Sequence, residues 1–174
     1  MILNWIEPFV LSTPEAIRAI ELLFAWSMCI QTLEYWRMRP ATRGEGLWIW
    51  SIQRQDIPNA WMRQVFDALF TDNMFSTLLV LRFVALASLA IQGNHIVNIG
   101  FLFLSNLAIL IRWRGAFNGG SDFMTLVGLT GLLIAHLVGA WQGMDAGWRA
   151  GFWYITLQSL TSYFMSGWVK QIGR

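Results

Sequence analysis

The sequence is poor in charged residues. Only 13% of its 174 residues are Asp, Glu, Lys or Arg, whereas an ordinary soluble domain has about 25%. The chain is 56% hydrophobic and contains 11 Trp and 12 Phe. This composition excludes an ordinary soluble enzyme and predicts a chain that is largely surrounded by lipid.

Cysteine and clustered basic residues are also scarce. The single cysteine, Cys29, lies in an apolar run, so an internal disulfide and a Cys-based metal site are excluded. The formal net charge is +2, and no basic patch is interleaved with aromatic residues, so no nucleic-acid partner is predicted. The sequence contains no serine-histidine-acid set, P-loop or zinc motif, and no metal site is predicted.

Long apolar runs predict an all-α, multipass bundle of about five transmembrane helices, forming a single domain over residues 1–174. A span needs about 20 residues at 1.5 Å rise per residue. The expected spans are 15–36, 75–92, 96–111, 122–141 and 149–168. Arg18 and Glu21 are three residues apart and can pair on one helix face. Gly128, Gly131 and Gly139 allow another helix to approach the fourth span closely.

The longest polar connection, 37–74, is predicted to lie at the cytoplasmic membrane surface. From Pro58 onward, Trp61, Val65 and Leu69 recur at helical spacing. This pattern predicts an interfacial amphipathic helix, and a re-entrant hairpin is the alternative. Later in the chain, 142–147 is predicted to form a loop.

The hinge at 112–122 contains two arginines, two adjacent glycines and a possible cap at Ser121 or Asp122. One interpretation is that Arg112, Arg114 and Ser121 bind a lipid phosphate headgroup at a helix N-terminus. The alternative is a tight turn followed by a helix cap.

Several polar residues are expected at membrane depth, where they would pair across the bundle or line a pocket. They are Arg82, Asn98, Asn106, Gln158 and Tyr163. His95 and His136 are candidate cofactor ligands because imidazole binds haem, chlorophyll or quinone. Hydrogen-bonded histidines without a ligand are the alternative. Gln158 and Tyr163 are candidates for the same cofactor, which is unknown and could be a lipid, a quinone or a pigment.

The distribution of Lys and Arg predicts the orientation. Nine of the 12 fall in the connection 37–74, at the hinge or near the C-terminus: Arg37, Arg39, Arg43, Arg54, Arg63, Arg112, Arg114, Lys170 and Arg174. Arg18 and Arg149 lie on the other side. The hinge and C-terminus are therefore expected in the cytoplasm, and the N-terminus outside, in a bacterial inner membrane.

The last third of the chain resembles a known family. Trp113, Phe117 and Asn118-Gly-Gly-Ser-Asp122 open a helix, and about 30 residues later come Gln158, Tyr163-Phe164, Ser166-Gly167 and Lys170. This order is similar to the transmembrane domain of the vitamin K-dependent gamma-carboxylase family, whose bacterial relatives are the HTTM or SdpB-like proteins. The resemblance implies that Lys170 is a catalytic base acting with a lipophilic cofactor. Lys170 as a topology-setting charge is the alternative.

Three functions are compatible with the sequence. The first is a non-catalytic accessory or assembly subunit of a larger membrane complex, respiratory or photosynthetic, with lipids and other membrane subunits as partners. The second is a membrane enzyme, or half of one, that uses Lys170 and a quinone-like cofactor. Transport is less favoured because the broken-helix pairs and inverted repeat of transporters are missing.

Overall fold

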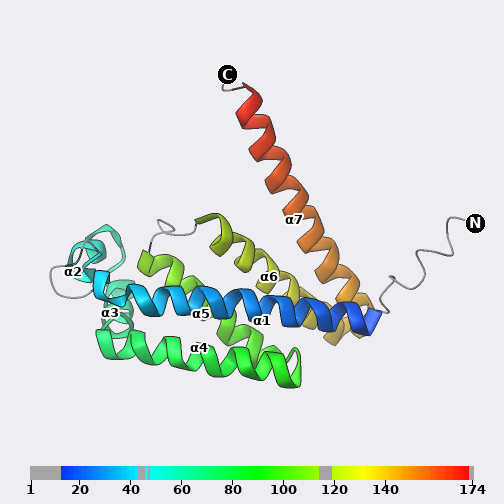
Figure 1. Ribbon diagram of the computed structural model, residues 1–174, viewed down its shortest axis with the longest axis horizontal. Coiled ribbons are helices and arrows are strands. Elements are labelled where there is room, and N and C mark those ends of the chain that lie inside the picture. Colours follow the sequence, from blue (N-terminus) through cyan, green and yellow to red (C-terminus); the bar gives the residue numbers. More distant parts are fainter. Residues whose placement is uncertain (1–12, 43–45, 47, 114–118, 173–174) are drawn as a thin grey trace, which may run out of the picture.

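The computed structural model describes residues 13–42, 46, 48–113 and 119–172. Every element in these ranges is a helix. Four helices run along the long axis of the molecule: α1 (Thr13–Met38), α4 (Asp72–Gln92), α5 (Ile96–Trp113) and α6 (Gly119–Gln142). The last helix, α7 (Met144–Ile172), starts beside α6 and leaves the bundle (Figure 1). The predicted all-α class is confirmed.

Four segments are long and apolar enough to cross a membrane, as expected of a multipass membrane protein. They are Pro14–Thr42, Asp72–Gln92, Ile96–Trp113 and Ser121–Gln142. They overlap the first four spans expected from the sequence. Helix α7 has 29 residues, as many as the longest of these segments, but is not in this set. It carries Asp145, Arg149 and Lys170 together with several Ser and Gln side chains.

Short helices cover one end of the bundle, between α1 and α4. They are a 3₁₀ turn (Arg39–Thr42), α2 (Trp50–Gln53), a second 3₁₀ turn (Arg54–Asp56) and α3 (Ala60–Leu69). The helix expected after Pro58 is therefore present. It begins at Ala60 because the Asn59 side chain accepts hydrogen bonds from the Trp61 and Met62 amides.

Arg112 holds this covering segment on the bundle. Its guanidinium donates to the Trp48 and Thr42 carbonyl oxygens at 2.8 and 3.2 Å and to the Gln53 side-chain oxygen at 2.7 Å. The side chain is buried next to the Trp50 ring. Arg112 therefore attaches the end of α5 to a segment about 60 residues earlier in the chain.

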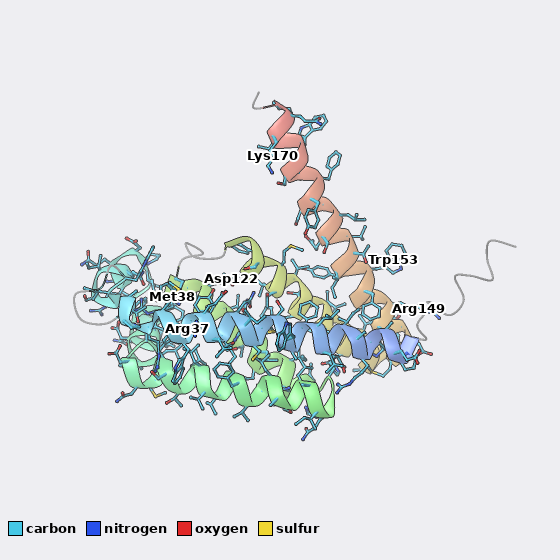
Figure 2. All side chains as sticks on the ribbon, in the orientation of Figure 1. Arg37, Met38, Asp122, Arg149, Trp153 and Lys170 are labelled. Carbon is cyan, nitrogen blue, oxygen red and sulfur yellow. The ribbon has the colours of Figure 1, made fainter. Side chains whose placement is uncertain are left out.

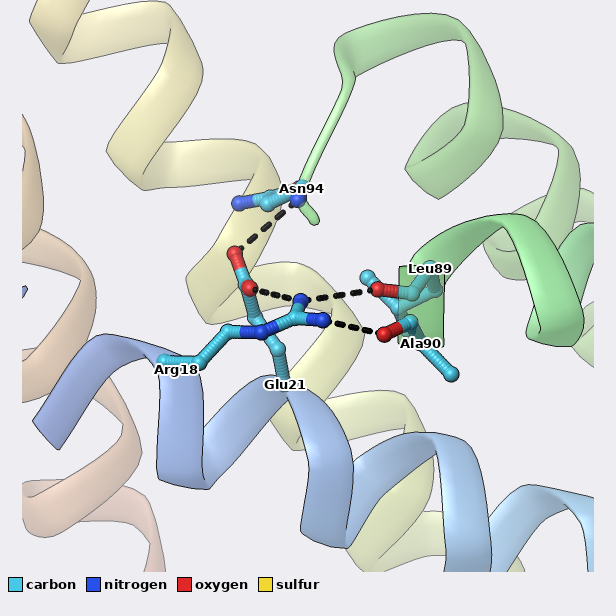
Figure 3. A network of polar contacts seen from close by, with 5 residues as sticks. All are labelled: Arg18, Glu21, Leu89, Ala90 and Asn94. Carbon is cyan, nitrogen blue, oxygen red and sulfur yellow. Dashed lines mark hydrogen bonds and ion pairs between the residues drawn. The ribbon is translucent and has the colours of Figure 1, made fainter. Parts of the chain in front are cut away.

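At the other end, an ion pair attaches α1 to the turn between α4 and α5 (Figure 3). Arg18 and Glu21 pair at 3.0 Å, as predicted from their spacing. Arg18 also donates to the Leu89 and Ala90 carbonyl oxygens at the end of α4, and Glu21 accepts from the Asn94 amide at 2.9 Å. The Ala90 oxygen and the Asn94 amide are backbone groups at the end of α4 that these side chains satisfy, while the Leu89 oxygen also accepts from the Gly93 amide at 3.1 Å.

The turn from α6 to α7 is tighter than expected. The predicted loop at 142–147 is wrong, because only Gly143, with φ of +92°, separates the two helices. The expected cap at Ser121 or Asp122 is also wrong. Helix α6 begins at Gly119, so both residues lie in its first turn.

Glycines bring α6 and α7 into direct backbone contact. A Cβ added at Gly147 would lie 2.2 Å from the Ala135 carbonyl oxygen, and one at Gly151 would lie 2.5 Å from the Gly131 oxygen. The predicted close approach on the glycines of the fourth span is confirmed at Gly131 and Gly139. Gly128 instead makes room for the Phe24 ring of α1. The α6–α7 contact is therefore made by the first half of α7.

Candidate functional site: a buried polar layer

A layer of polar side chains joins α1, α4, α5 and α6 inside the bundle. We call it the polar layer, and its members are Gln31, Thr32, Tyr35, Arg82, Ser105, Asn106, Asp122 and Thr125. Apolar side chains pack on one side of it, around Met28, Leu89 and Leu102. An aromatic cluster that includes Phe75 and Trp113 packs on the other side.

Arg82 is at the centre of this layer and is completely buried. Its Nε donates to the Thr32 hydroxyl at 3.0 Å, and its terminal nitrogens donate to the Ser105 hydroxyl at 2.9 Å and the Asn106 side-chain oxygen at 3.0 Å. A longer contact, 3.4 Å, reaches the Leu102 carbonyl oxygen. Four of the five guanidinium N–H donors are thus used, all on neutral acceptors.

The hydroxyls around Arg82 also have their own acceptors. Thr32 donates to the Met28 carbonyl oxygen at 2.6 Å, and Ser105 donates to the Leu102 oxygen at 2.9 Å. Each hydroxyl therefore accepts from Arg82 while it donates to its own helix. This arrangement satisfies the guanidinium without leaving a hydroxyl proton unpaired.

Asp122 and Tyr35 extend the layer between α1 and α6. The Tyr35 hydroxyl donates to the Asp122 carboxylate, and the Asn106 amide donates to the Asp122 carbonyl oxygen at 3.4 Å. One turn away, Gln31 donates to the Thr125 hydroxyl at 2.8 Å. Two side-chain pairs, one turn apart on each helix, therefore align α1 with α6.

The layer is well suited to hold four helices in register. A polar side chain in hydrocarbon is costly unless it is paired, so sliding or rotating one helix would break several hydrogen bonds together. The described residues contain no group of three or more His, Cys, Asp and Glu placed to hold a metal ion. The hydrogen bonds of the layer support helix association.

The predicted pairing across the bundle is confirmed for Arg82, Asn98 and Asn106. Arg82 and Asn106 bond to each other, and Asn98 donates to the Ala85 carbonyl oxygen at 3.0 Å. Gln158 and Tyr163 do not join them, because both are exposed on α7.

The two histidines are on different elements. His95 is exposed in the turn before α5, where its Nδ1 accepts from the Val97 amide at 3.4 Å. His136 is partly buried on α6, with its ring 6.5 Å from that of Trp148. Neither histidine belongs to the polar layer.

The two described headgroup candidates, Arg112 and Ser121, have different environments. Arg112 is buried and bonded to the covering segment, while Ser121 is exposed at the start of α6. Arg114 lies outside the described residues. Lys170 is exposed at the far end of α7, distant from Asp122 (Figure 2).

A groove between α6 and α7 brings two predicted residues together. It has a volume of about 550 Å³ and is lined by Ser121, Phe123 and Met124 from α6 and by Ser162, Tyr163 and Ser166 from α7. Ser121 and Tyr163 were predicted for different ligands, and the structure places both on the walls of this groove.

Sequence reasoning missed the contributions of α1 to the polar layer. Gln31 and Tyr35 are four residues apart, a spacing that puts them on one helix face. That spacing was the available signal. Asp122 was interpreted as a helix cap, so its partnership with Tyr35 was not foreseen.

No family model, curated protein or solved structure matches the chain. The resemblance to the gamma-carboxylase transmembrane domain therefore stays a prediction.

Proposed function

We propose that this protein is a small multipass subunit that scaffolds or assembles a larger membrane complex. The observation that supports this proposal is the second half of α7. Every residue from Leu160 to Ile172 is exposed, although this stretch includes Phe164 and Trp168. The helix extends away from the other four (Figure 1). The exposed stretch also carries Ser162 and Ser166, and polar side chains at membrane depth without cover in their own chain are typical of a surface that contacts other membrane proteins.

We propose further that α7 is the fifth span and that the membrane is a bacterial inner membrane. Arg37 and the covering segment lie at one end of the bundle, and Arg149 lies at the other (Figure 2). The positive-inside rule then puts the hinge and the C-terminus in the cytoplasm and the N-terminus outside. In this topology α3 lies on the cytoplasmic membrane surface, with the exposed Trp61 and Val65 side chains among the lipid headgroups.

The test is purification from native membranes in mild detergent, followed by mass spectrometry. We expect membrane subunits to co-purify with the intact chain in stoichiometric amounts. We expect them to be lost when the chain is truncated after Ile155. The truncated chain keeps the four-helix bundle and the glycine contact, so it is a matched control. Recovery of the intact chain alone would contradict the proposal.

The family resemblance supports a separate hypothesis, in which Lys170 is the base of an enzyme with a lipophilic cofactor. A bound quinone-like molecule would be visible in the absorption spectrum of the same preparation. Lys170→Ala would then abolish activity and leave assembly unchanged.

A further inference from the structure

Helix α7 carries small and polar side chains at several positions of the face that it turns toward α6. Gly147 and Gly151 are buried on this face, against α6. Farther along, Gln158, Ser162 and Ser166 follow at spacings of seven, four and four residues, which keeps them on the same face. We call these three side chains the polar seam. The seam therefore continues the α6–α7 interface beyond the point where the two helices separate.

The opposite face of α7 is large and apolar. Trp153, Leu157, Leu160, Phe164 and Trp168 recur at spacings of four, three, four and four residues, and all are exposed. We call them the aromatic ridge. Side chains of this kind are compatible with lipid tails, so the ridge needs no protein cover inside a membrane.

The polar seam cannot be covered in the same way. Lipid tails offer no hydrogen-bond partner, so hydroxyl and amide groups at membrane depth are normally paired with other protein groups. Ser162 and Ser166 of the seam line the groove of about 550 Å³ together with Tyr163, and the other wall is formed by Ser121, Phe123 and Met124 of α6. A concave site between two separating helices, with hydroxyls on both walls, has the shape and chemistry to accept a third helix.

We propose that the polar seam and the α6 wall receive one transmembrane helix of another membrane protein, through a face of hydroxyl, amide or small side chains. This inference rests on the proposed function and names its docking site. Two observations support it: the seam continues an established helix–helix interface, and its Ser and Gln groups both donate and accept hydrogen bonds.

The test is photo-crosslinking in native membranes with benzoylphenylalanine, placed at Ser162 in the seam or at Phe164 on the ridge. The expected result is an adduct from position 162 on a transmembrane segment of a subunit that co-purifies with the chain, and no protein adduct from position 164. The crosslinked peptide, mapped by mass spectrometry, must contain small or hydrogen-bonding residues at helical spacing.

A paired substitution measures the contribution of the seam. Ser162→Leu with Ser166→Leu is expected to reduce the recovered partner about tenfold, by removing two interhelical hydrogen bonds and filling the groove. Ser162→Thr with Ser166→Thr keeps both hydroxyls and is expected to retain most of it. Both serines are exposed, so the thermal unfolding of the isolated chain should be the same for both variants.

Three results would overturn the inference while leaving the proposed function intact, provided that partners still co-purify. In the first, position 162 crosslinks only to α6 of the same chain or to a second copy of the chain. In the second, protein adducts form only from position 164. In the third, neither position gives an adduct. If no partner co-purifies with the unmodified chain, the proposed function itself fails.

Discussion

Removing the buried charge of Arg82 is expected to destabilise the bundle less than removing one of its neutral partners. A charge in the middle of a span costs about 2.5–3.5 kcal/mol on insertion scales. Arg82 donates four hydrogen bonds to protein acceptors, and these offset the cost of burying its charge. Interhelical polar contacts in membranes average about 0.6 kcal/mol, so four of them offset about 2.4 kcal/mol, close to the cost of the charge.

The variant Arg82→Met replaces the guanidinium with an apolar side chain of similar length. The hydroxyls that it leaves already donate to carbonyl oxygens of their own helices, at Met28 and Leu102. We therefore expect the free energy of unfolding to change by less than about 1 kcal/mol. Asn106→Leu instead removes a hydrogen-bond acceptor of the buried, charged Arg82 side chain. It is expected to lower the free energy of unfolding by about 2 kcal/mol.

The measurement is reversible unfolding in mixed micelles with increasing SDS, followed by helicity. The double variant Arg82→Met/Asn106→Leu should recover most of the loss caused by Asn106→Leu alone. Asn98→Leu is the matched control, because Asn98 bonds only a backbone carbonyl, and about 0.6 kcal/mol is expected there. If Arg82→Met is the more damaging single change and the two losses add, the reasoning is wrong.

Three further changes test the contacts that hold the bundle together. Gly147→Ala puts a methyl group 2.2 Å from a carbonyl oxygen and should cost about 1–3 kcal/mol in detergent unfolding, whereas Gly167→Ala, with nothing within 4 Å, should be neutral. Arg112→Met should expose the covering segment to limited proteolysis without unfolding the four long helices, and unchanged cleavage would show that other contacts hold that segment. Glu21→Gln keeps an acceptor for the Asn94 amide but loses the ion pair with the partly exposed Arg18. Because such ion pairs contribute little, the free energy of unfolding should fall by less than about 1 kcal/mol, and a larger loss would contradict this expectation.

The sequence predicted the helices better than the contacts between them. Long apolar runs define membrane helices because the bilayer fixes their length, and the first four spans differ from the observed helices only at their ends. The Arg18–Glu21 pair was also predictable, because helix geometry alone brings residues three apart together. The partners of Arg82 come from two other helices, α1 and α5, and no local pattern indicates which side chains meet there.

The wrong predictions have local causes. Ser121 and Asp122 are good capping residues, so the sequence placed the start of α6 at them, but the structure extends the helix back to Gly119 and turns Asp122 inward to Tyr35. The glycines at 143 and 147 look like loop residues by composition. Only Gly143 turns the chain, while Gly147 is small because α6 lies against it.

The polar groups of this chain fall into two sets with different consequences. Those of the four-helix bundle bond largely to one another, as Arg82 does with Thr32, Ser105 and Asn106, and they fix the register of the helices. Those of the polar seam on α7 lie beyond the last residue that α6 buries, Gly151, and Ser162 and Ser166 line a groove. In the function that we propose, the first set is satisfied within the chain, whereas the second is covered by a helix of another protein. In the function that we propose, the bundle is the support that holds α7 in position, and the contact with another membrane protein is made along α7.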